Sequence, residues 1–175
     1  MSGIRPAWSD ASPPQLGLTR SGSLRPCTIA SPTASGCVSS SPTAAPNQFM
    51  SPLRYGTTGR DVAFKRVRAQ LAAGVEDFQL LSADSADYIH AVSEDGDLEL
   101  HFLPPEDDGS GFVTFRLISA KPSVMRPFCA SRGCVNGNNE QRARIERLRD
   151  ACGWKSADAS FDGDKFDGWV PIFLH

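Results

Sequence analysis

Hydrophobic and polar residues alternate along the middle of the chain, which is the pattern of half-buried β-strands. The alternation is regular at Leu98, Leu100 and Phe102, and again at Val113, Phe115 and Leu117. Strand-like runs occupy residues 77–83, 87–93, 97–103 and 111–120. An Asp-Gly pair at 95–96 lies between two of these runs and is a strong hairpin signal. The pattern predicts an antiparallel meander of about four strands.

Helical periodicity appears on both sides of this meander. In residues 57–74, Phe64, Val67 and Leu71 are spaced for one helix face, and Gly74 is expected to end the helix. A second helix is expected from Asn138, which with Gln141 resembles a capping box. Its apolar stripe consists of Ile145, Leu148 and Cys152, and Gly153 is expected to end the helix. The order helix, meander, helix predicts an α+β fold, with both helices on one face of the sheet.

The two ends of the chain differ in composition from this middle part. Residues 1–60 contain five arginines and a single acidic residue, Asp10, among many Ser, Thr and Pro. Composition therefore divides the chain into an extended arm (1–45), an α+β domain (46–154) and an aromatic tail (155–175). We expect the apolar side chains of the two ends to bind a partner protein. They are Trp8, Leu16, Leu18, Phe161, Phe166, Trp169, Ile172 and Phe173.

Overall charge and hydropathy argue against two classes of partner. The net charge of −2 and a pI near 5.9 provide no general attraction to nucleic acid. No apolar run approaches the roughly 18 residues that a transmembrane helix requires. The Ser-rich, Arg-containing N-terminal segment is compatible with the remnant of an organelle transit peptide and equally with an ordinary disordered tail. Because no transmembrane helix is expected, contact with a membrane is expected only through a protein complex.

Cysteines form two close pairs in the sequence. Cys27 and Cys37 could close one loop and Cys129 and Cys134 another, which would leave Cys152 unpaired. The alternative is five free thiols in a reducing compartment. Zinc would need four ligands, and none of the three histidines is spaced to supply the others, so we expect no metal and no cofactor. The Cys129–Cys134 spacing also differs from Cys-x-x-Cys, which favours a structural turn.

Candidate catalytic or nucleic-acid-binding residues are few. Four arginines of the second helix, at 142, 144, 147 and 149, alternate with acidic residues and are expected to form a solvated face. His90 and His101 lie on adjacent expected strands, where a packed or surface role is commoner than catalysis. The chain lacks Gly-x-Ser-x-Gly, a phosphate-binding glycine loop with Lys, and His-Glu-x-x-His. No enzymatic activity is therefore expected.

Several short motifs, in their order along the chain, resemble domain of unknown function family 1499. They are Gly36-Cys37-Val38-Ser39-Ser40, Tyr88-Ile89 with Ala91, Arg116 with Ser119 and Ala120, and Gly137 with Asn139, Arg144, Ile145 and Glu146. The chain departs from the family at the loop 121–135, which carries a cysteine pair, and two extra residues follow Gly137-x-Asn139. The paired cysteines after Leu24-Arg25-Pro26 look like the plant and algal branch. The resemblance implies a chloroplast location on the thylakoid lumen side and no agreed activity.

Taken together, these patterns suggest a non-catalytic accessory subunit or assembly factor of a thylakoid photosynthetic complex, bound to other protein subunits through its extended ends. One alternative is a lumenal domain that binds a small ligand or lipid on the uncovered sheet face. A weaker alternative is a thiol redox sensor that uses Cys129 and Cys134.

Overall fold

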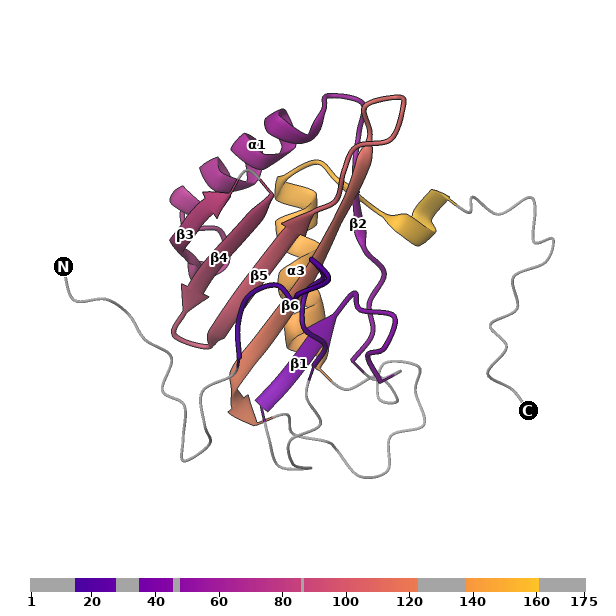
Figure 1. Ribbon diagram of the computed structural model, residues 1–175. Coiled ribbons are helices and arrows are strands. Elements are labelled where there is room, and N and C mark those ends of the chain that lie inside the picture. The colour runs from indigo at the N-terminus through magenta and orange to yellow at the C-terminus, as the bar shows by residue number, and fades with distance from the viewer. Residues whose placement is uncertain (1–14, 28–34, 46–47, 86, 123–137, 161–175) are drawn as a thin grey trace.

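The computed structural model describes residues 15–27, 35–45, 48–85, 87–122 and 138–160 (Figure 1). In chain order the elements are β1 Ser35–Ser39, β2 Leu53–Tyr55, α1 Arg60–Ala72, the short 3-10 helix η1 Val75–Asp77, β3 Gln79–Ser85, β4 Tyr88–Ser93, β5 Gly96–Phe102, β6 Gly111–Pro122, α3 Asn139–Ala151, β7 Lys155–Ser156 and the 3-10 helix η2 Ala157–Ser160.

The strands form one antiparallel sheet, so the predicted α+β class is confirmed. Within the described residues the sheet has seven strands, in the order β3-β4-β5-β6-β2-β7, with β1 also paired to β6. The prediction of about four strands was wrong because it counted only the meander β3–β6. Strands β2 and β7 span three and two residues, too few to show an alternating pattern, and β1 follows a Ser/Pro-rich run.

Strand β6 joins the two halves of the sheet. One edge of this 12-residue strand pairs with β5 from Val113 to Ser119. Its other edge pairs with β2 near Gly111–Val113 and with β1 from Arg116 onward. The sheet therefore includes β1 from the segment assigned by composition to the arm, and β7 from the segment assigned to the tail.

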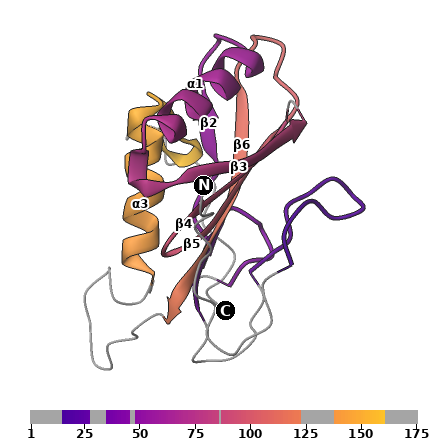
Figure 2. The same cartoon turned by 90° about the vertical axis from the view of Figure 1, so that its left-hand side faces the viewer.

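Both helices lie on the same side of the sheet, as Figure 2 shows. The predicted stripes are buried: Phe64, Val67 and Leu71 on α1, and Ile145, Leu148 and Cys152 at α3. They pack with the alternating residues of β5 and β6 in one hydrophobic core. Within this core the rings of Phe64 and Trp154 lie edge-on to the ring of Phe102, with centroids 5.3 and 5.9 Å away. Both helices end before a glycine with positive φ, Gly74 and Gly153, as predicted.

The start of α3 differs from the expected capping box. Asn138 has a left-handed backbone (φ 55°) and makes no side-chain hydrogen bond that caps the helix. Its Nδ2 instead donates to the main-chain oxygen of Cys37, 3.2 Å away. The capping-box prediction was therefore wrong, because the Asn138 side chain joins the helix to strand β1 instead of closing on Gln141.

The hairpin between β4 and β5 is present, with its turn one residue earlier than the Asp-Gly pair suggests. Ser93 pairs with Gly96, which leaves Glu94 and Asp95 as the loop. Gly96 has φ 151° and lies against β6, where a Cβ atom would be 1.9 Å from the main-chain oxygen of Ile118. Only glycine fits this position.

Residues 15–27, which we call the strap, lie on the opposite side of the sheet from the helices (Figure 2). Leu18 and Leu24 form an isolated antiparallel bridge that folds the strap into a small loop. A further hydrogen bond runs from the Thr19 amide to the Ser23 carbonyl. The strap covers part of the second sheet face.

Candidate functional site

The second face of the sheet contains a buried ion pair. Glu99 of β5 and Arg116 of β6 are cross-strand neighbours in the register, and their side chains are 0% and 3% exposed. The Arg116 Nε donates to Glu99 Oε2 at 2.6 Å. Tyr88 of β4 donates its hydroxyl to Glu99 Oε1 at 2.7 Å. Burial first, and then the bond to this carboxylate, raise the pKa of Tyr88, so that the hydroxyl stays a donor.

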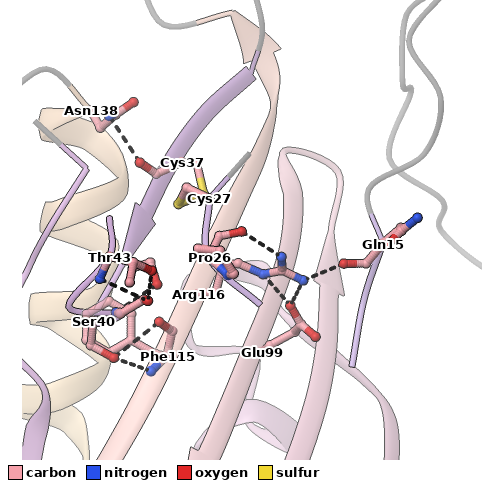
Figure 3. The surroundings of a disulfide bond; sticks show 12 residues. Gln15, Pro26, Cys27, Cys37, Ser40, Thr43, Glu99, Phe115, Arg116 and Asn138 are labelled. Atoms are coloured by element: carbon pink, nitrogen blue, oxygen red, sulfur yellow. Dashed lines mark hydrogen bonds and ion pairs between the residues drawn. A yellow bond between two sulfur atoms is a disulfide. The ribbon is translucent and has the colours of Figure 1, made fainter. Parts of the chain in front are cut away.

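Main-chain groups of the strap provide further hydrogen bonds to this ion pair (Figure 3). The Arg116 guanidinium donates to the carbonyls of Gln15 and Pro26, at 2.7 and 3.3 Å. The Gly17 amide donates to Glu99 Oε1 at 2.5 Å. A charge buried in an apolar setting is very costly unless it is paired and hydrogen-bonded. The strap supplies both the cover and several of these hydrogen bonds.

A disulfide between Cys27 and Cys37 fixes the end of the strap to strand β1. The two Cα atoms are 5.9 Å apart, within the normal range for a disulfide. Both cysteines are buried against Ile118 of β6, and Leu16 packs on the same cluster. The first of the two candidate pairs is thus joined, while Cys129 and Cys134 lie outside the described residues. Cys152 is a free, buried thiol, and burial raises its pKa to about 12.

The two histidines of the meander do not pair with each other. His90 Nε2 lies 2.8 Å from Asp97 Oδ1, and His90 is opposite Glu99 in the register. His101 is opposite Tyr88, and its buried Nδ1 has no hydrogen-bond partner within the described residues. Burial lowers the pKa of His101, since desolvation disfavours the charged imidazolium.

On the helix side, a cleft of about 720 Å³ lies between η1, the β4–β5 hairpin and α3. Its apolar lining includes Leu71, Phe78 and Leu80, and its charged lining residues are Glu76, Asp77, Glu94, Asp95, Glu140, Arg144 and Arg147. Glu76 and Asp77 both have φ 57°, an uncommon conformation for residues with a side chain.

Arg144 forms one wall of this cleft and is buried, so the prediction of a solvated arginine face was wrong at this position. Its guanidinium carbon is 4.2 Å from the centre of the Phe78 ring. Its Nη2 donates to the Glu76 carbonyl at 2.6 Å and to Ser93 Oγ at 3.1 Å. Arg147 is exposed but also pairs with Glu76, and this bond lowers the pKa of that carboxyl. The arginines at 144 and 147 therefore bind η1 rather than neighbours on their own helix.

The residues predicted to bind a partner are only partly described by the structure. Leu16 packs against the Cys27–Cys37 disulfide, and Leu18 bridges Leu24 within the strap. Both belong to a segment that folds back onto its own chain. The others, which are Trp8, Phe161, Phe166, Trp169, Ile172 and Phe173, lie outside the described residues.

Sequence reasoning missed the two groups that organise the site, Glu99 with Arg116 and Arg144 with η1. The available signal was the opposite charge of Glu99 and Arg116 on neighbouring expected strands; no local pattern marks Arg144 as buried. Among the described residues no three His, Cys, Asp or Glu side chains gather as metal ligands would. In the same part of the chain, no helix has the length and apolar character to cross a bilayer.

No protein-family model, curated protein or solved structure matches the chain.

Proposed function

We propose that this protein is a non-catalytic accessory subunit or assembly factor of a larger protein complex, on the lumenal side of the thylakoid. The observation that carries the proposal is how its buried charges are used. Glu99 is bound by Arg116, Asp97 by His90, and Arg144 by Ser93 and the Glu76 carbonyl. A structural role would require charges to be held in this way by groups of the same chain.

The disulfide supports the compartment in this proposal. Disulfides persist in oxidising compartments and are rare in the cytosol. The Cys27–Cys37 bridge is therefore compatible with a lumenal protein, although it is compatible with other oxidising compartments as well.

Membership of domain of unknown function family 1499 is part of the same proposal. Four of the residues that carry the resemblance make buried or partly buried polar contacts in this fold. Ser40 Oγ binds the Phe115 amide at 2.8 Å, Tyr88 and Arg116 hold Glu99, and Arg144 holds the hairpin at Ser93. A shared set of such contacts would give related chains the same strand register.

Native separation of gently solubilised thylakoids tests the accessory-subunit proposal. The full chain is expected to migrate with a complex far larger than its own 18.8 kDa, and deletion of residues 161–175 to weaken that association. The matched control is a Leu81→Ser variant, which removes an exposed hydrophobic side chain from the described domain. A wild-type chain that migrates alone at native abundance would contradict the proposal.

The cleft favours a second candidate, a binding domain for a small ligand. Its volume of about 720 Å³ is within the usual range for ligand pockets, roughly 300–1,000 Å³. Native mass spectrometry of the protein purified from its source would then detect a bound compound. Glu140→Trp, which enlarges a side chain that lines the cleft, should lose that compound. Glu146→Trp, exposed on the same helix but outside the cleft lining, should retain it.

A further inference from the structure

The cleft on the helix side of the sheet has more negative than positive charge in its lining. Five carboxylates line it but only two guanidiniums, those of Arg144 and Arg147. Both guanidiniums pair with the same carboxylate, that of Glu76. The other four carboxylates therefore leave an excess of negative charge, which favours a cationic ligand over an anionic one.

Three of these carboxylates have no partner of their own. Among the described residues, the side chains of Asp77, Glu94 and Glu140 make no hydrogen bond or ion pair. All three are exposed, and they come from three different elements, namely η1, the β4–β5 loop and the first turn of α3. The cleft therefore offers acceptor oxygens to a ligand from three sides.

The wall of the cleft already holds one cation of the chain itself. The Arg144 guanidinium lies 4.2 Å from the centre of the Phe78 ring. It donates to the Glu76 carbonyl and to Ser93 Oγ. An aromatic face and several oxygen acceptors are the usual surroundings of a bound organic cation. The same wall is thus suited to a second cation beside the first.

The distribution of the carboxylates favours an elongated cation over a metal ion. Within the described part of the chain, no three acidic, His or Cys side chains gather closely enough to hold a metal. Carboxylates spread around a cleft fit several ammonium groups separated by alkyl linkers. Leu71, Ala72 and Leu80 provide apolar lining for such linkers, and the volume of about 720 Å³ is ample for a molecule of this kind.

We infer that this cleft is a binding site for a linear polyamine, an alkyl chain that carries two or more ammonium groups. The ammonium groups donate hydrogen bonds to Asp77, Glu94 and Glu140, and the alkyl segments lie against Leu80. The inference rests on the second candidate function, a domain that binds a small ligand, and names the chemical class of that ligand.

Calorimetric titration of spermidine into the full-length protein tests this inference. Wild type is expected to bind it with an affinity that falls as salt is added. The triple variant Asp77→Asn, Glu94→Gln, Glu140→Gln should bind about tenfold or more weakly, because charge-assisted hydrogen bonds are lost. The three changes keep side-chain size, and Asn tolerates the φ of 57° at residue 77. No binding by wild type, or equal affinity of both proteins, would overturn the inference.

A matched pair of single variants separates the cleft from general attraction to an acidic protein. Glu140→Gln is expected to weaken spermidine binding about threefold or more. Glu146→Gln removes the same charge from an exposed position of α3 outside the cleft lining, and its affinity should stay within about twofold of wild type. Equal losses in the two variants would overturn the inference.

Butylamine is the matched ligand control, because it has an alkyl chain and a single ammonium group. It should bind about tenfold or more weakly than spermidine, and equal affinity would overturn a site for several ammonium groups. Native mass spectrometry of the protein from its source distinguishes this inference from the function on which it rests. A bound compound without amino groups would overturn the polyamine inference and still support a ligand-binding domain, whereas a bound polyamine would support both.

Discussion

Glu99 and Arg116 face each other across the β5–β6 pair, both almost fully buried beneath the strap. Arg116→Met would leave the carboxylate of Glu99 buried without its cationic partner. Breaking a buried pair on one side typically costs about 3–5 kcal/mol, so we expect a loss of that order in the free energy of unfolding measured in urea.

The matched control for this prediction is the double variant Arg116→Met with Glu99→Leu. Replacing both members of a buried ion pair by apolar residues is often close to neutral. The double variant is therefore expected to recover most of the stability that Arg116→Met loses. If the two variants were equally unstable, the loss would come from packing and from the strap hydrogen bonds of Arg116, which both variants lack, and not from an unpaired charge.

The Cys27–Cys37 bridge should contribute measurably to global stability. A disulfide that closes a loop of about ten residues stabilises a protein by roughly 2–3 kcal/mol in the chain-entropy model. Cys37→Ser should lower the free energy of unfolding by about this amount. Dithiothreitol should lower the stability of wild type by more than it lowers that of the variant, because the variant lacks the Cys27–Cys37 bridge. An equal response of both proteins to dithiothreitol would contradict the prediction.

Gly96 is expected to be intolerant of any side chain. A Cβ atom would approach the Ile118 carbonyl to 1.9 Å, and the clash is with backbone that cannot move without disturbing β6. Gly96→Ala should cost about 2–4 kcal/mol in urea denaturation. Gly56→Ala is the matched control, since a Cβ at Gly56 meets no atom within 4 Å, and its effect should stay within about 0.5 kcal/mol. Similar losses at both positions would contradict the steric explanation.

The fold was predictable where one local pattern decides the structure. The alternation at Leu98–Phe102 and the helical spacing of Phe64 to Leu71 both gave elements that the structure confirms. The same alternation places Glu99 on the outer face of the sheet, where a charged residue is usually solvated. It is buried because the strap, more than 70 residues away in sequence, folds over that face.

Arg144 shows a second limit of local patterns. Its position in a run of alternating charges is typical of a solvated helix face. The structure buries it because η1, with two consecutive residues in the left-handed region, directs the Glu76 carbonyl toward its guanidinium. That backbone conformation occurs at Glu76 and Asp77, residue types without glycine's freedom, so no turn signal in the sequence indicates it.

Arg144 and Arg149 therefore make a matched pair on one helix. Arg144→Gln loses the stacking on Phe78 and leaves the Glu76 carbonyl and Ser93 without their charged donor. We expect a loss of about 2–3 kcal/mol in the free energy of unfolding. Arg149 pairs with its neighbour Asp150 at the surface, and Arg149→Gln should change stability by less than about 0.5 kcal/mol. If Arg144→Gln and Arg149→Gln changed stability equally, the buried role of Arg144 would be contradicted and a uniformly solvated helix face would be supported.

The burial of His101 predicts a specific dependence of stability on pH. Desolvation places the pKa of His101 in the folded state below the value of 6.5 that it has when exposed. Between these two pKa values the unfolded chain binds a proton that the folded chain does not, so protonation favours unfolding. The stability associated with neutral His101 is therefore complete above pH 6.5 and declines as the pH falls through 6.5 toward the lower folded-state pKa. Urea denaturation of wild type and His101→Gln at several values between pH 7.5 and pH 5 should show a shallower decline for the variant. If wild type and His101→Gln lost stability in parallel as the pH fell, the folded-state pKa of His101 would not be lowered. Burial would then not disfavour its charged form.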